Sequence, residues 1–375
     1  MNETSAPGGR RTRVALVFGG RSGEHAISCA TAAGVLRALD PERYEVLPIG
    51  ITPDGQWVLT AADPDALALG GAELPSVPAS SSDVVLPMAQ DRRDLTVTEP
   101  GQVPRSLGEV DVVFPVLHGP YGEDGTLQGL LELAQLPYVG SGVLASAVGM
   151  DKHYMKVVLA GHGLPIGPYT VISPRQWRTD HTAALDAVAA LGFPVFVKPA
   201  RAGSSLGITK VEREQDLVAA VEEAQRHDPK VIVEAALEGR EIECAVLEGH
   251  GDELPRTALP GEIAVGDHAF YDFESKYLDT SGVDLICPAD LPDSVSERVR
   301  ELAAQAFDAL GCEGLARVDF FVTDSGHVTI NEVNTMPGFT PYSMYPLMWE
   351  RSGLSYGELL DELIALALER STGLR

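Results

Sequence analysis

The sequence predicts a mixed fold, with an α/β unit at the N-terminus and α+β units after it. Residues 13–18 form an apolar strand pattern that ends at Gly19, and a helix pattern (24–39) and a strand pattern (44–51) follow, which is the order of a βαβ opening. Beyond this opening, short strand and helix patterns alternate with connections brief enough for antiparallel pairing. Near the end of the chain, alternating apolar and charged residues predict a hairpin.

The rest of the first unit contains a further sheet strand and a helix. Residues 61–108 are rich in Ala, Pro, Ser and Asp and have weak periodicity, so we expect a surface segment outside the central sheet. An apolar strand pattern over 110–115 and a helix pattern over 127–136 come next. We therefore place the first unit at residues 1–141.

The remaining chain divides into a second unit at 142–234 and a third at 235–375. Periodicity in the second unit predicts helices 151–160, 181–191 and 214–225 and strands 195–198, 208–211 and 231–234. In the third unit it predicts a strand at 241–247, a polar loop at 270–288, a helix at 294–310, the hairpin, and an amphipathic helix at 356–369.

Composition narrows the class of protein. The chain has 375 residues, 45% of them hydrophobic, and a formal net charge of -26, from 28 basic and 54 acidic residues. This charge argues against nucleic-acid or anionic-membrane partners, which require a basic face. Four cysteines without metal-ligand spacing are too few for a disulfide framework. Because Gly, Pro or charged residues interrupt every apolar run, no membrane span is expected, and we expect a cytoplasmic protein.

The hairpin carries the most informative polar residues. Side chains two positions apart share a face of a strand. Arg317 and Asp319 therefore point the same way on one strand, and Glu332 and Asn334 point the same way on the next. Hard oxygen ligands of this kind suit Mg²⁺, which shares its other coordination sites with water and phosphates. The pattern predicts a metal-nucleotide site, although a half-solvated hairpin with its turn at residues 324–326 has the same pattern.

Two further segments could bind a nucleotide. Lys198 leads into a Gly- and Ser-rich stretch that ends at Gly207, where backbone amides could approach a phosphate; a hairpin turn without a ligand explains it equally well. The connector from Glu234 to Glu241 could read an adenine edge with its backbone, and Glu241 could hold ribose hydroxyls. Solvated loop carboxylates are the alternative there.

Taken in order, six motifs resemble those of the D-alanine:D-alanine ligases of the ATP-grasp superfamily. They are Gly19-Gly-Arg-Ser-Gly-Glu24-His25, His118-Gly-Pro-Tyr-Gly-Glu-Asp-Gly125, Gly140-Ser-Gly142 with Met150-Asp-Lys152, the stretch from Lys198 to Gly207, Phe270-Tyr-Asp-Phe-Glu-Ser-Lys276-Tyr277, and Asn331-Glu-Val-Asn-Thr-Met-Pro-Gly338. The resemblance covers nearly the whole chain. It implies a three-domain ATP-grasp fold with an N-terminal Rossmann-like domain.

The resemblance also implies a reaction. ATP would phosphorylate the carboxylate of a first D-alanine, and the amine of a second D-alanine would displace phosphate from the acyl phosphate. Asp319, Glu332 and Asn334 would hold two Mg²⁺ or Mn²⁺ ions, and a monovalent cation is a possible addition. The residues implied to bind ATP are Lys152, Lys198, Ser204, Ser205, Glu234, Ala235, Leu237, Glu241 and Lys276.

The D-alanine subsites follow from the same resemblance. Glu24 would pair with the ammonium of the first D-alanine, and His118 would line that subsite. Arg317 and the backbone N–H of Gly338 would stabilise the oxyanion, and Ser343 would bind the second carboxylate. Ser204 and Tyr277 would close over the site with Glu24 and exclude water.

Alternatives to dipeptide synthesis remain at this stage. A D-alanine:D-lactate or D-alanine:D-serine ligase keeps the same site with another acceptor, and the Lys276-Tyr277 pair favours the dipeptide makers. A catalytically silent nucleotide-binding protein would have lost a metal ligand or Arg317, and both are present. Apolar helices in the first unit make a homodimer the expected assembly.

Overall fold

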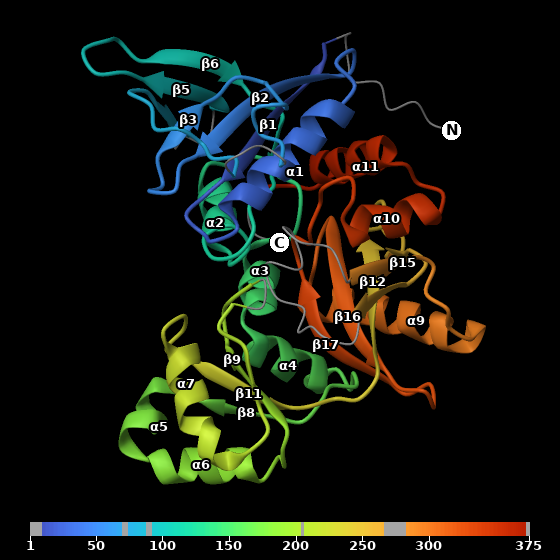
Figure 1. Ribbon diagram of the computed structural model, residues 1–375. Coiled ribbons are helices and arrows are strands. Elements are labelled where there is room, and N and C mark those ends of the chain that lie inside the picture. The colour runs from blue at the N-terminus through green and yellow to red at the C-terminus, as the bar shows by residue number, and fades with distance from the viewer. Residues whose placement is uncertain (1–9, 70–73, 88–91, 204–205, 266–282, 373–375) are drawn as a thin grey trace.

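The computed structural model describes residues 10–69, 74–87, 92–203, 206–265 and 283–372. The N-terminal unit (blue) lies at the top of Figure 1, the central unit (green to yellow) at the bottom, and the C-terminal sheet (orange) beside both. Ser204 and Ser205, which the resemblance assigns to ATP binding, lie outside the described residues, as does most of the polar loop predicted at 270–288. Strand β14 (Gly261–Val265) precedes the predicted loop, and strand β15 (Val283–Ile286) lies within it, so the loop prediction was wrong at 283–286.

The N-terminal sheet has the strand order β3-β2-β1-β7. Strand β1 (Thr12–Gly19) pairs in parallel with β2 (Tyr44–Ile51) and β7 (Val112–Pro115), and β3 (Trp57–Leu59) pairs antiparallel with β2. Helix α1 (His25–Ala38) connects β1 to β2, so the predicted βαβ opening is confirmed. Six consecutive residues of β1 are buried, as expected for a parallel strand that is covered on both faces.

The segment at 61–108 lies outside this sheet, as predicted. It forms a small antiparallel sheet of its own from β4 (Asp83–Val85), β5 (Asp94–Thr98) and β6 (Arg105–Glu109). These strands were not predicted, because their buried residues are few: Leu95 and Val97 of β5 and Val84 of β4 join the N-terminal core.

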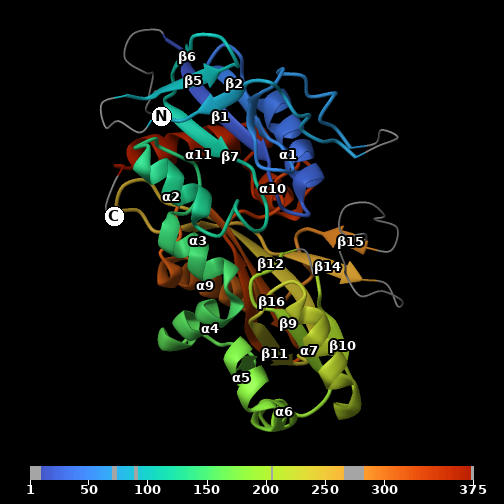
Figure 2. The same ribbon diagram turned by 90° about the vertical axis from the view of Figure 1, so that its left-hand side faces the viewer.

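Helices α2 (Thr126–Leu133), α3 (Val143–Met150) and α4 (Lys152–Gly161) lead away from the N-terminal sheet. Figure 2 shows α3 and α4 beside α9, and contacts confirm this packing. Ala145, Met155 and Leu159 share a core with the C-terminal sheet rather than with the central one. The domain boundaries near 142 and 235 stay predictions.

The central unit is an antiparallel sheet with the order β10-β9-β11-β8. Its strands are β8 (Tyr169–Ile172), β9 (Val195–Pro199), β10 (Thr209–Val211) and β11 (Val231–Ala235). Helices α5 (Pro174–Thr179), α6 (His181–Ala189) and α7 (Leu217–Gln225), the last preceded by a 3₁₀ turn (Glu214–Asp216), complete the unit. Strand β11 occupies an interior position in the sheet, and its first four residues are buried.

The C-terminal sheet has the order β15-β14-β12-β16-β17, with β13 (Arg256–Thr257) beside β12. The predicted hairpin is β16 (Leu315–Val322) and β17 (Val328–Asn334), and β12 (Arg240–Leu247) pairs with β16. Helices α9 (Asp293–Leu310), α10 (Met344–Arg351) and α11 (Tyr356–Glu369) pack around the sheet. Helix α11 also contacts α1, and so it connects the C-terminal sheet to the N-terminal unit.

A charged contact fixes the loop after β12 onto α11. Nε2 of His250 lies 2.8 Å from Oε2 of Glu362, and Nδ1 lies 2.9 Å from Oε1 of Glu369. Nη2 of Arg256 also lies 2.9 Å from Oε2 of Glu362. The hydrogen bond to Glu362, which is stronger in effect than partial burial, raises the pKa of His250 above 6.5. The contact therefore stabilises the fold fully below pH 6.5, and this stabilisation is lost as pH rises through the raised pKa.

This contact gives a pH-dependent stability prediction. The substitution His250→Gln should lower the melting temperature by at most about 2 °C near pH 6, because partly exposed ion pairs contribute little. The difference from the wild type should vanish near pH 9. Thermal scans across this range measure it, with exposed His162→Gln as the matched control. A difference between wild type and variant that does not change with pH contradicts the assignment.

Among the residues that the structure describes, no helix is both long enough and apolar enough to span a membrane.

Candidate active site

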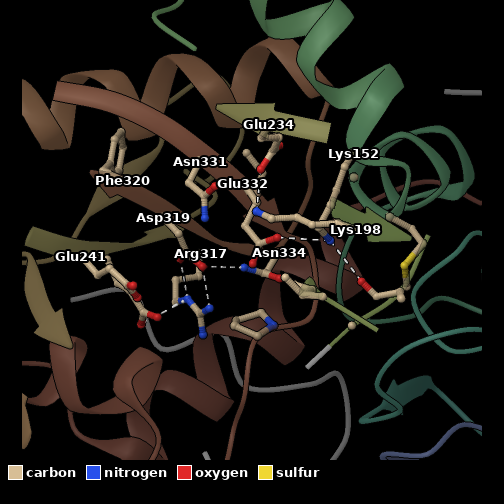
Figure 3. Close-up of a pocket in the computed structure, with 18 of the residues that line it drawn as sticks. Lys152, Lys198, Glu234, Glu241, Arg317, Asp319, Phe320, Asn331, Glu332 and Asn334 are labelled. Atoms are coloured by element: carbon tan, nitrogen blue, oxygen red, sulfur yellow. Dashed lines mark hydrogen bonds and ion pairs between the residues drawn. The ribbon is translucent and has the colours of Figure 1, made fainter. Parts of the chain in front are cut away.

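A cavity of about 430 Å³, here called the central cavity, lies where the three units meet. Figure 3 shows its polar lining, with side chains from β9, β11, α4 and the β16–β17 hairpin pointing toward one another. Most of the predicted site residues line it. They are Glu24, His118, Lys152, Lys198, Glu234, Ala235, Leu237, Glu241, Arg317, Asp319, Glu332, Asn334 and Gly338.

The hairpin places its four polar residues on one face, as predicted. Arg317 is opposite Asn334, and Asp319 is opposite Glu332, before a bulge between Asp319 and Phe320. Nε and Nη2 of Arg317 each donate to a different carboxylate oxygen of Asp319 at 2.7 Å, and Nδ2 of Asn334 donates to Asp319 at 3.0 Å. The strand register thus gathers a guanidinium, two carboxylates and an amide.

Arg317 is charged although its side chain is only 17% exposed. Burial disfavours its charge, but the carboxylates of Asp319 and Glu243 outweigh burial and hold the pKa of Arg317 well above its usual value. Glu243 lies on β12, opposite Asp319 in the register, and its Oε2 is 3.2 Å from Nε of Arg317. The site therefore holds a fixed cation with a planar donor fork.

The donor set on the hairpin fits a magnesium site. Asp319 and Glu332 supply two carboxylates from opposed positions, and Asn334 adds an amide on the same face. Within the described part of the chain, no three His, Cys, Asp or Glu side chains gather as a metal site. A pair of carboxylates is nevertheless sufficient for Mg²⁺, which takes its remaining ligands from water and phosphates.

Two lysines enclose Glu234 on the opposite side of the central cavity. Lys198 on β9 donates to Oε2 of Glu234 at 2.5 Å, and Lys156 on α4 lies 3.0 Å from Oε1. Burial alone would raise the pKa of Glu234, but the charges of Lys198 and Lys156 outweigh it and lower the pKa to about 2. Glu234 is therefore a buried, ionised carboxylate with a cation at each oxygen.

Lys152, at the start of α4, connects the lysine-rich side to the hairpin. Its Nζ donates to the carbonyl of Ala202 at 3.0 Å and lies 3.2 Å from Oε2 of Glu332. Burial disfavours its charge, yet Glu332 and Glu234 outweigh burial and raise the pKa of Lys152. Lys152 thus presents a permanent positive charge beside the possible metal ligands.

The N-terminal unit contributes a small acidic and histidine group. Glu24 and His118 are both buried, and Nδ1 of His118 lies 3.2 Å from the carbonyl oxygen of Met336. Burial lowers the pKa of His118 despite the nearby charge of Glu24. Glu123 accepts a hydrogen bond from the backbone N–H of Gly119, while burial and then the charge of Glu24 raise its pKa to about 8.

Some predicted residues are not brought to the central cavity by the described structure. Ser343 precedes α10, and its Oγ bonds to the hydroxyl of Thr340 at 2.8 Å; it is not part of the cavity lining. Ser204, Ser205, Lys276 and Tyr277 lie outside the described residues.

The structure adds cavity residues that the sequence analysis missed. Lys156, Glu123 and Glu243 line the polar part, and Phe196, Ile242 and Phe320 form an apolar part together with the predicted Leu237. Two of these had a detectable signal. Lys156 follows Lys152 by four residues and so shares its helix face, and Glu243 follows Glu241 by two and so shares its strand face.

Comparison with known proteins places this site in a family. Residues 13–141 match the family described as "D-ala D-ala ligase N-terminus", and residues 158–365 match "D-ala D-ala ligase C-terminus". The chain belongs to the D-alanine:D-alanine ligase family. Within this family, a protein of Paenarthrobacter aurescens named "D-alanine--D-alanine ligase" is 60% identical over 100% of both chains. One of the same name from Streptomyces avermitilis is 58% identical over 98% of this chain and 96% of its own.

Solved structures of the family agree with the fold. The VanG D-Ala:D-Ser ligase from Enterococcus faecalis has a TM-score of 0.82 and 36% identity, covering 96% of this chain and 100% of its own. The D-alanine-D-alanine ligase from Coxiella burnetii has a TM-score of 0.78 and 36% identity, covering 96% and 94%. The predicted ATP-grasp fold is thereby confirmed.

Proposed function

We propose that this chain joins two molecules of D-alanine into D-alanyl-D-alanine, with ATP as the energy source, for peptidoglycan precursor synthesis. ADP and phosphate are released, and the reaction passes through an acyl phosphate. The observation that carries the proposal is the central cavity, where a ligase-family chain gathers fixed cations and paired carboxylates from all three units. The acidic composition of the chain favours small-molecule substrates over nucleic acid. We place the protein in the cytoplasm.

ATP binds across the lysine-rich side in this proposal. Lys152 and Lys198 approach the phosphates, joined by Ser204, Ser205 and Lys276 from outside the described residues. The apolar lining that includes Phe196 and Phe320 accommodates the adenine ring. The polar atoms around the nucleoside come from the connector after β11, through Glu234, Ala235, Leu237 and Glu241.

The hairpin residues act on the phosphoryl group. Asp319, Glu332 and Asn334 hold two Mg²⁺ ions, or Mn²⁺ in their place. When bound, these ions neutralise the triphosphate and the group being transferred. Arg317 stabilises the oxyanion of the reacting carboxylate, together with the backbone N–H of Gly338, because both lie in the same lining. A monovalent cation is a further proposed component.

The D-alanine molecules occupy the end of the central cavity formed by the N-terminal unit. The carboxylate of Glu24 pairs with the ammonium of the first D-alanine, and His118 lines the same subsite. Neutral His118 suits this position, because burial lowers its pKa and no like charge then opposes the ammonium. Ser343 binds the second carboxylate only if the segment before α10 brings it closer than it lies here. A homodimer is the proposed assembly.

Product identification tests the proposed function. Purified protein with Mg²⁺-ATP is incubated with D-alanine, L-alanine, D-alanine plus D-lactate, or D-alanine plus D-serine, and products are identified by mass. D-alanyl-D-alanine, formed only from the D-enantiomer, is the expected result. The VanG relative is named as a D-Ala:D-Ser ligase, so a mixed product with D-serine is the specific alternative that this assay detects. Predominance of a mixed product contradicts the dipeptide assignment.

Tyr277 gives a prediction about acceptor choice. In the proposal Tyr277 closes over the site with Ser204 and Glu24, so Tyr277→Phe should weaken discrimination between D-alanine and D-lactate while changing the Kd for ATP by less than about 3-fold. The expected loss is that of a single hydrogen bond, so kcat/KM for D-alanine as the acceptor should fall roughly 10-fold. Steady-state kinetics with both acceptors measure this effect. Unchanged acceptor preference together with unchanged kcat removes Tyr277 from the mechanism.

A further inference from the structure

Lys156 is a buried cation that the proposed reaction does not use. It lies on α4, one helical turn after Lys152, and its side chain is 3% exposed. Its ammonium has two anchors, because Nζ lies 3.0 Å from Oε1 of Glu234 and donates to the backbone carbonyl of Asn331 on β17 at 3.1 Å. Lys156 therefore has a fixed place between the central sheet and the C-terminal hairpin.

Lys198 shares Glu234 with Lys156 but is held differently. It bonds the other carboxylate oxygen, Oε2, and its side chain is 13% exposed in the central cavity. Among the described residues, the ammonium of Lys198 has Glu234 as its ion-pair partner. No backbone carbonyl in the described structure accepts a hydrogen bond from Lys198, whereas the carbonyl of Asn331 accepts one from Lys156. Of the two lysines, Lys198 is thus the one that can turn toward a ligand.

A buried carboxylate restricts this movement. If Glu234 had Lys198 as its sole countercharge, moving Lys198 to a phosphate would leave an ionised carboxylate buried without a cation, which is strongly unfavourable. Glu234 would then compete with the phosphate for Lys198. A second cation that stays at Glu234 removes this competition.

We propose that Lys156 is a positioning residue that keeps Glu234 neutralised, so that Lys198 can leave this carboxylate for the phosphates of bound nucleotide. The inference rests on the proposed function in one respect, namely that the phosphates of ATP lie within reach of Lys198. Two other roles for Lys156 make different predictions: a direct phosphate ligand, and a structural link between α4 and β17.

The test compares the affinities of Lys156→Met for ADP and for adenosine, measured by calorimetry at fixed Mg²⁺ without D-alanine. The ratio of the two dissociation constants reports on the phosphate contacts alone. In Lys156→Met, ADP should bind roughly 10-fold more weakly, the effect of losing one charge-assisted hydrogen bond, while the affinity for adenosine changes little. The ratio should therefore shift by the same factor. Equal weakening of both ligands identifies a structural link and overturns the proposal.

The double variant Lys156→Met/Glu234→Gln separates the remaining roles. Removing the carboxylate frees Lys198, so the ADP-to-adenosine ratio should return to within about 3-fold of that of Glu234→Gln alone. If Lys156 is instead a direct phosphate ligand, removing Glu234 restores nothing, and that result overturns the proposal. Lys156→Gln, which can still donate to the carbonyl of Asn331, provides the same ratio if the methionine variant does not fold.

Lys230→Met is the matched control. Lys230 pairs with Asp151 near the start of α4 but does not line the central cavity, so its loss should leave the ADP-to-adenosine ratio unchanged. The product assay on the wild type distinguishes failure of the proposed dipeptide synthesis from failure of the positioning role of Lys156. Dipeptide formation with an unchanged ratio in the Lys156 variants refutes the positioning role alone. The expected ratios without any dipeptide refute the proposed function alone.

Discussion

The substitution Arg317→Lys is expected to lower kcat for dipeptide formation by about 100-fold or more, the cost of removing a donor from a developing oxyanion. Arg317 is mostly buried, and its planar fork donates to both oxygens of Asp319 at 2.7 Å. Lysine keeps the positive charge beside Asp319 and Glu243 but loses the fork geometry. The kcat of the purified variant at saturating substrates therefore measures the loss of oriented donors.

A comparison with Arg317→Met shows why lysine is the informative choice. Methionine leaves Asp319 and Glu243 without their cation, and breaking a buried ion pair in this way costs about 3–5 kcal/mol of stability. The methionine variant should therefore melt well below the lysine variant. If the lysine variant keeps kcat within about 3-fold of the wild type, Arg317 has no part in oxyanion stabilisation.

Removing a proposed metal ligand should have the next largest effect. In Asp319→Asn the Mg²⁺ concentration for half-maximal activity should rise by roughly 10-fold or more, and kcat should fall by about 100-fold, because one carboxylate ligand is lost. A Mg²⁺ titration of initial rates measures both quantities. The exposed Asp324→Asn, in the turn of the same hairpin, is the matched control and should match the wild type.

Glu332→Gln separates metal binding from the contact with Arg317. Glu332 lies opposite Asp319 in the register and 3.2 Å from Nζ of Lys152, whereas Asp319 accepts both hydrogen bonds of the Arg317 fork. If both carboxylates bind metal, both variants should shift the Mg²⁺ titration in the same direction. A shift in Asp319→Asn alone would mean that its effect passes through Arg317, and the assigned metal site would be wrong.

Local sequence patterns were sufficient to predict the elements that carry the site. The β16–β17 hairpin followed from strict alternation around Arg317 and Asp319, and alternation fixes which side chains share a face whatever the sheet packs against. Strand β1 followed from its uninterrupted apolar run. Helix α11 followed from its amphipathic spacing, and the structure adds a capping box formed by Ser355 and Glu358 at its start.

Other features depend on contacts far apart in the chain and could not be predicted this way. The role of Lys156 is visible only once α4, β11 and β17 meet, since its partners Glu234 and Asn331 are 78 and 175 positions away. Helix α3 has small apolar residues and no polar face, so periodicity did not reveal it. Strand β15 is recognisable mainly through its pairing with β14.

In the proposed reaction, the carboxylate of the first D-alanine attacks the γ-phosphate of ATP. The most direct test uses D-alanine labelled with ¹⁸O in its carboxylate and follows the label by mass spectrometry of the phosphate and nucleotide products. Because the acyl phosphate loses phosphate with the bridging carboxylate oxygen, one ¹⁸O is expected in each released phosphate. Label in AMP, or phosphate that carries oxygen from water instead, would rule out attack by the D-alanine carboxylate on the γ-phosphate.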